Sequence, residues 1–94
     1  MTRAAEESQL AARLRQAVQG CTLHPNGPVQ SWSAVLAAGK AGRVDPVEVV
    51  RQAIRSCLGR ADELRAAGVA EDDPRVRKEL VASSFLTTMA TGLR

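Results

Sequence analysis

The chain has 94 residues, which fits a single domain, 1–94, in which only roughly 60 to 65% of the unfolded surface can be buried. It contains one Trp, one Phe and no Tyr, so its core must consist mainly of Ala, Leu and Val, and we expect self-association to supplement so thin a core. The net charge of +3, from 13 basic and 10 acidic residues without blocks of one sign, excludes a strongly acidic acyl carrier.

The first predicted helix covers residues 3–18. Thr2 is a suitable N-cap, because a Thr hydroxyl accepts a hydrogen bond from a backbone N–H of the first turn. Leu10, Leu14 and Val18 lie on one stripe at helical spacing, and Gly20 is placed to end the helix. Its polar face is expected to carry four charged residues, Glu6, Glu7, Arg13 and Arg15.

The second predicted helix begins at Pro28, because proline tolerates the first helical position. It follows a loop over residues 21–27, CTLHPNG, whose turn dipeptides disfavour helix. Its apolar stripe consists of Val29, Trp32 and Leu36. Gly39 and Gly42 end it.

The third predicted helix has the clearest start in the sequence. Asp45, Pro46 and Glu48 provide an N-cap acceptor, an N1 proline and an N3 carboxylate in the order of a capping box. A stripe roughly 120° wide indicates a helix that faces the core. Its members are Val47, Val50, Ile54, Cys57, Leu58, Ala61 and Leu64.

This helix is expected to end at Gly68 in a Schellman cap. With Gly68 at the position after the cap, Leu64 and Val69 are the apolar pair that accompanies this motif. Gly59 is unexpected inside this helix, since an interior glycine destabilises a helix by roughly 1 kcal/mol relative to Ala. It indicates either a bend or the close approach of another backbone.

The fourth predicted helix starts at Asp73 and Pro74 by the same combination of cap and proline, and continues to Ala90. The short connection around Gly68 favours an antiparallel arrangement of the last two helices. We therefore predict an all-α fold, a small bundle of three to four short helices in which the last two form an antiparallel helical hairpin.

The end of the chain is unusual, because residues 80–93 carry no charge. An apolar terminal segment must be covered, either by its own domain or by a partner, and the sequence leaves both alternatives open. Ser83, Ser84, Thr87 and Thr88 are expected to bond back to carbonyls of the preceding turn, and so to be small packing residues.

A protein partner or a homo-oligomer is the leading hypothesis for this segment. Aromatic and Met side chains are enriched in the centres of protein interfaces. The candidate partner-binding residues are Trp32, Val81, Phe85, Leu86, Met89 and Leu93. These residues indicate a small non-enzymatic interaction module, such as an adaptor, an assembly or secretion chaperone, or a regulator.

A basic nucleic-acid-binding regulator is the alternative hypothesis. It would use the candidate phosphate contacts Lys40, Arg43, Arg51 and Arg55. Two glycines interrupt the connection that a helix-turn-helix alignment requires. Glu48 and Asp62 lie within helical reach of Arg51 and Arg55, so they offset much of the positive potential.

The sequence contains no constellation for catalysis, and we expect neither an enzyme nor a cofactor. Phosphate-loop, nucleophile-elbow and metalloprotease motifs are absent, and there is one histidine. Cys21, His24 and Cys57 are too few for a structural zinc, so we expect no metal. A charged start without a signal peptide and an apolar run too short for a membrane span predict a cytoplasmic protein.

Overall fold

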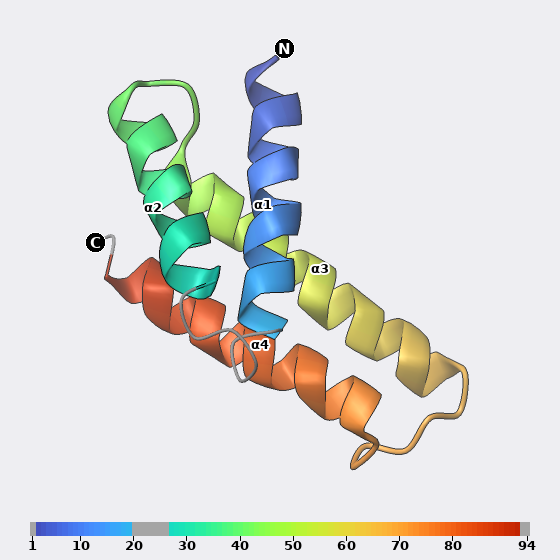
Figure 1. The fold of residues 1–94 in the computed structure, drawn as a ribbon. Coiled ribbons are helices and arrows are strands. Elements are labelled where there is room, and N and C mark those ends of the chain that lie inside the picture. The colour runs from blue at the N-terminus through green and yellow to red at the C-terminus, as the bar shows by residue number, and fades with distance from the viewer. Residues whose placement is uncertain (1, 20–26, 93–94) are drawn as a thin grey trace.

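The computed structural model describes residues 2–19 and 27–92. These residues form α1 (Arg3–Gln19), α2 (Gly27–Lys40), α3 (Pro46–Ala66) and α4 (Pro74–Thr91), and none of them lies in a strand. Figure 1 shows α1 and α2 side by side, crossing over the antiparallel hairpin that α3 and α4 form. The predicted all-α bundle with a terminal helical hairpin is confirmed.

The predicted starts of α1, α3 and α4 are confirmed at atomic detail, and α2 begins at Gly27, one residue before the predicted Pro28. A carboxylate oxygen of Asp45 accepts the backbone N–H of Val47 at 3.0 Å, and Asp73 accepts that of Arg75 at 2.9 Å. The Arg75 guanidinium also donates to Asp73, and these two hydrogen bonds, the side-chain one first, lower the pKa of Asp73 below its ordinary 3.8. At α1 the Thr2 hydroxyl accepts the backbone N–H of a first-turn residue at 3.1 Å.

One of the two hydrogen bonds of the predicted capping box is made by a different residue. The backbone N–H of Asp45 donates to Glu7 of α1 at 2.8 Å, whereas Glu48 lies 3.6 Å from Arg51 and 4.0 Å from Arg55. Glu7 is buried, because α1 passes beside the start of α3. The carboxylate that accepts the N–H of the N-cap residue therefore comes from a neighbouring helix, in place of the predicted Glu48.

The Schellman cap at the end of α3 is confirmed. Gly68 has a φ of +88°, its N–H donates to the carbonyl of Arg65 at 3.0 Å, and the N–H of Val69 donates to the carbonyl of Leu64 at 3.0 Å. Leu64 and Val69 pack together in the same apolar cluster. This cap sets the turn that leads the chain back along α3 as α4.

Two apolar clusters hold the helices together. The main core lies where all four helices meet, and its large fully buried members include Leu14, Val35, Val49, Val50, Cys57 and Leu86. A second, smaller cluster lies toward the closed end of the hairpin and consists of Ala61, Leu64 and Val76, with Val69 and Leu80 packed against it. The helix α4 contributes to both clusters: Val76 belongs to the smaller cluster, and Ala82 and Leu86 belong to the main core.

The predicted apolar stripes are partly wrong. On α3, Val47 and Leu58 are exposed, whereas Val49 and Ala53 are fully buried. On α2, Leu36 is exposed and its neighbour Val35 is buried. The helix α3 packs against α4 and also against α1 and α2, so its buried arc keeps Val50, Cys57, Ala61 and Leu64 of the predicted stripe and extends to Val49 and Ala53.

Candidate protein-binding surface

The outer side of α4 presents two large apolar side chains to solvent. Val81 is 65% exposed and Phe85 is 43% exposed, and they lie one helical turn apart. Thr88 is also on the surface, and its hydroxyl donates to the carbonyl of Ser84 at 3.2 Å. The exposed side of α4 from Val81 to Thr88 is therefore uncharged and partly apolar.

The other candidate partner-binding residues lie elsewhere. Leu86 is completely buried in the main core, so it is not accessible to a partner in this fold. Trp32 and Met89 are half-buried and pack against the same core. Leu93 lies outside the residues that the structure describes. Of the predicted set, Val81 and Phe85 are the residues that the fold leaves most available.

A groove of about 560 Å³ lies beside Val81, between the end of α1 and the first half of α4. Its apolar lining consists of Val18, Pro74, Val81 and Ala82, and its polar lining of Gln19, Asp72, Arg77 and Lys78. Arg77 and Lys78 have no ion pair among the described residues. The groove thus combines apolar side chains with two basic residues and one acidic residue.

Of the four predicted residues, Ser83, Thr87 and Thr88 donate their hydroxyl groups to carbonyls of the preceding turn. The Ser83 hydroxyl donates to the carbonyl of Leu80 at 2.8 Å, and the Thr87 hydroxyl donates to the carbonyl of Ser83 at 2.8 Å. Their protons are already engaged, and their side chains are short. Ser83 is buried, so its short side chain packs inside the bundle, whereas Thr87 is exposed.

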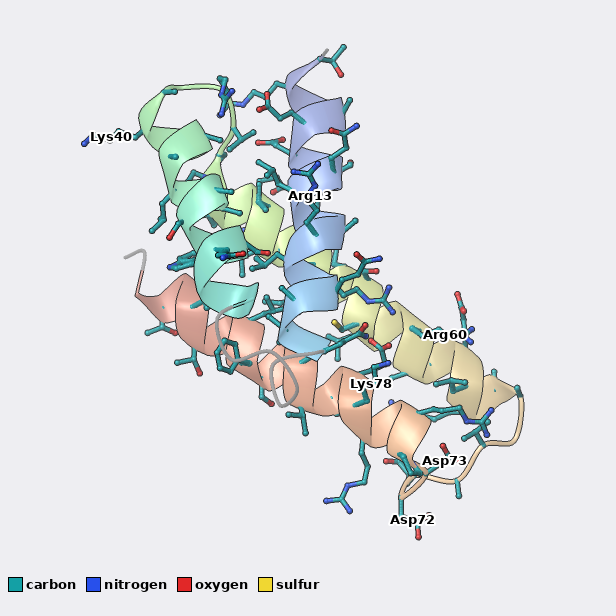
Figure 2. The ribbon with its side chains drawn as sticks, in the orientation of Figure 1. Arg13, Lys40, Arg60, Asp72, Asp73 and Lys78 are labelled. Carbon is teal, nitrogen blue, oxygen red and sulfur yellow. The ribbon has the colours of Figure 1, made fainter. Side chains whose placement is uncertain are left out.

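The four basic residues of the alternative hypothesis face different neighbours. Arg43 lies 3.5 Å from Glu6 of α1, while Arg51 and Arg55 flank Glu48 and line a groove against α4. Lys40 projects from the end of α2, away from the other three helices (Figure 2). Asp62 pairs with Arg65 at 3.2 Å, so of the two expected carboxylates only Glu48 contacts Arg51 and Arg55.

A buried polar cluster connects α1 to α4, although the sequence placed Arg15 on a polar face. Glu79 is buried, and one of its oxygens accepts Arg15 at 2.9 Å and Gln19 at 2.6 Å. Cys57 lies beside this cluster: burial raises the pKa of its thiol above the ordinary 9.0, and the Glu79 carboxylate raises it further. The sequence did carry a signal that Glu79 is buried, because Glu79 lies three residues from both Val76 and Ala82, on the buried side of α4.

The described residues contain no group of three His, Cys, Asp or Glu side chains placed to hold a metal ion. Cys57 is a free, buried thiol, whereas Cys21 and His24 lie outside the described residues. Within the described part of the chain, no helix combines the length and apolarity needed to cross a bilayer.

Comparison of the chain with protein-family models, with curated protein sequences and with solved structures finds no match. A functional proposal therefore depends on the surface chemistry of the chain itself.

Proposed function

We propose that this protein is a non-enzymatic interaction module of the cytoplasm, an adaptor, assembly or secretion chaperone, or regulator, that binds another protein or a second copy of itself. The binding surface consists of Val81, Phe85 and the groove beside Val81. The exposure of these two side chains on one uncharged helix face is the observation that carries the proposal. Phe85 is the anchor, because aromatic side chains dominate the centres of interfaces.

The groove adds the area that two side chains alone lack. Full burial of a Phe or Val contributes roughly 1.5 to 3 kcal/mol, and part of Phe85 is already covered. Micromolar binding requires about 8 kcal/mol in total. A partner must therefore also contact the rest of the groove, where Pro74 is exposed while Val18 and Ala82 are almost fully buried.

Charge substitution on this face tests the proposal. Phe85→Asp and Val81→Asp place a carboxylate in the interface, and we expect each to abolish association, since an unpaired buried charge is strongly unfavourable. Leu58→Asp is the matched control, because Leu58 is 42% exposed but lies on α3. Light scattering measures the molar mass, and cross-linking in the source cells followed by mass spectrometry measures partner capture.

The proposal is supported if the wild type and Leu58→Asp both self-associate or capture the same partner and the α4 variants do not. Circular dichroism must show that all variants keep their helices. It is overturned if the wild type is monomeric and captures nothing, or if Leu58→Asp loses association to the same extent. Association that disappears steeply with added salt would instead support the nucleic-acid alternative.

A further inference from the structure

Arginine side chains gather where the second half of α1 crosses the hairpin. A pocket of about 360 Å³ is lined by Arg15 of α1 and by Arg55, Ser56, Gly59, Arg60 and Glu63 of α3. A second pocket of about 160 Å³ is lined by Arg60, Leu64, Arg75, Lys78 and Glu79. Because Arg60 lines both pockets, we treat them as one surface, the basic concavity.

The basic concavity carries more positive than negative charge. Its lining has five cationic side chains and two carboxylates. Glu79 is neutralised from within by Arg15, and Glu63 pairs with Arg60 at 3.1 Å in an exposed position where such pairs are weak. Lys78 has no ion pair among the described residues. Arg55 lies 4.0 Å from Glu48, and Arg75 lies 3.1 Å from Asp73. An anion entering the concavity therefore meets one cation without an ion pair, Lys78, and would compete with exposed pairs at Arg55, Arg60 and Arg75.

Gly59 gives a second, independent indication. A glycine inside a helix is unfavourable by roughly 1 kcal/mol relative to Ala, and here packing offers no reason for it. A Cβ at Gly59 would meet nothing within 4 Å, so the expectation that another backbone approaches it is wrong. Gly59 instead opens into the first pocket, between Arg55 and Arg60. The absence of a side chain keeps the space between these arginines free for a ligand.

We infer that the basic concavity binds a small ligand with several phosphate oxygens, such as a polyphosphate or a phosphate ester. The planar guanidinium groups of Arg55 and Arg60 match phosphate geometry and donate two hydrogen bonds each. The lining contains no aromatic side chain on which a nucleic-acid base could stack. Lys40 and Arg43, which an extended nucleic acid would also need, lie outside it. This site shares Lys78 with the groove beside Val81 of the proposed function, and no other lining residue.

Isothermal titration of the full chain with inorganic triphosphate at low salt tests the inference. Arg60→Ala removes a guanidinium that would donate hydrogen bonds to phosphate, and Gly59→Leu fills the pocket. We expect each variant to weaken triphosphate binding at least tenfold. Arg13→Ala and Lys40→Ala make the same change of charge outside the concavity, so we expect less than a threefold effect. Denaturant unfolding of every variant shows whether the fold is intact.

The inference is overturned if triphosphate does not bind the wild type, or if Arg13→Ala and Lys40→Ala weaken binding as much as Arg60→Ala does. It is also overturned if a single-stranded oligonucleotide binds far more tightly and Lys40→Ala abolishes that binding. Loss of triphosphate binding in Gly59→Leu with unchanged stability supports it most directly, because that variant alters shape without altering charge.

Discussion

Two glycines of this chain show how space around a single Cβ position decides the role of a residue. At Gly39, near the end of α2, an added Cβ would overlap the ring of Pro46, with its Cδ only 2.9 Å away. At Gly59, inside α3, an added Cβ would meet open space. The first glycine is needed for packing between α2 and the start of α3, and the second is not needed for folding.

Opposite effects on stability are therefore expected from the same substitution at these positions. Gly39→Ala should lower the free energy of unfolding by about 1 to 3 kcal/mol, because the rigid Pro46 ring must move. Gly59→Ala should raise it by about 0.5 to 1 kcal/mol, because Ala favours helix and meets no neighbour. Urea unfolding followed by circular dichroism measures both. A destabilised Gly59→Ala would contradict the open surroundings of that position.

At the scale of elements, the N-cap residue of α3 also contacts another helix. Asp45 caps the helix with its own carboxylate, while its backbone N–H is satisfied by Glu7 of α1 at 2.8 Å. Glu48, the carboxylate that the local sequence would select, is occupied on the surface by Arg51 and Arg55. The cap is thus also a tertiary contact, and it fixes where α1 lies along α3.

Substitution of the two glutamates distinguishes these roles. Glu7→Ala should cost about 1.5 to 3 kcal/mol, because it leaves the N–H of Asp45 without its buried charged acceptor. Glu48→Ala should change stability by less than about 0.5 kcal/mol, because it removes only exposed ion pairs. Thermal unfolding of the two variants beside the wild type gives the comparison. Equal losses would mean that Glu48 also contributes to the cap.

At the scale of the whole molecule, the cluster of Arg15, Gln19 and Glu79 connects the first helix to the last beside Cys57 of the main core. One Glu79 oxygen accepts two donors, while the other is buried without a partner among the described residues. A small core with few large side chains tolerates little unsatisfied polarity. This cluster therefore contributes to the specific placement of α1 on the hairpin while adding modestly to stability.

Breaking this cluster should be more harmful than replacing it. Glu79→Ala leaves Arg15 and Gln19 without their acceptor, and we expect a loss of about 2 kcal/mol, less than for a fully buried pair because the Arg15 side chain is 26% exposed. The double variant Arg15→Met with Glu79→Leu should lie within about 1 kcal/mol of the wild type, since apolar side chains fill the space without unpaired charge. Denaturant titration measures the free energy of unfolding of both variants. A double variant that is less stable than Glu79→Ala would show that the ion pair itself is strongly stabilising.

The helix boundaries were determined largely by local sequence. Asp45 with Pro46 and Asp73 with Pro74 start the last two helices, and Gly68 ends α3 in the expected cap. Each signal acts through hydrogen bonds within one turn, so no distant residue is needed to interpret it. The antiparallel hairpin follows from the short connection between two such helices.

The faces of the helices were decided only by tertiary structure. Apolar spacing assigned Leu58 to the core-facing stripe of the third helix and Leu86 to the partner-binding set, yet Leu58 is exposed and Leu86 is fully buried. It placed Glu7 and Arg15 in solvent, yet each is held by a partner on another helix. Local chemistry sets where a helix begins and ends, because its hydrogen bonds are short-range. Which side of it is buried depends on how many neighbours it has and on the angle at which they cross.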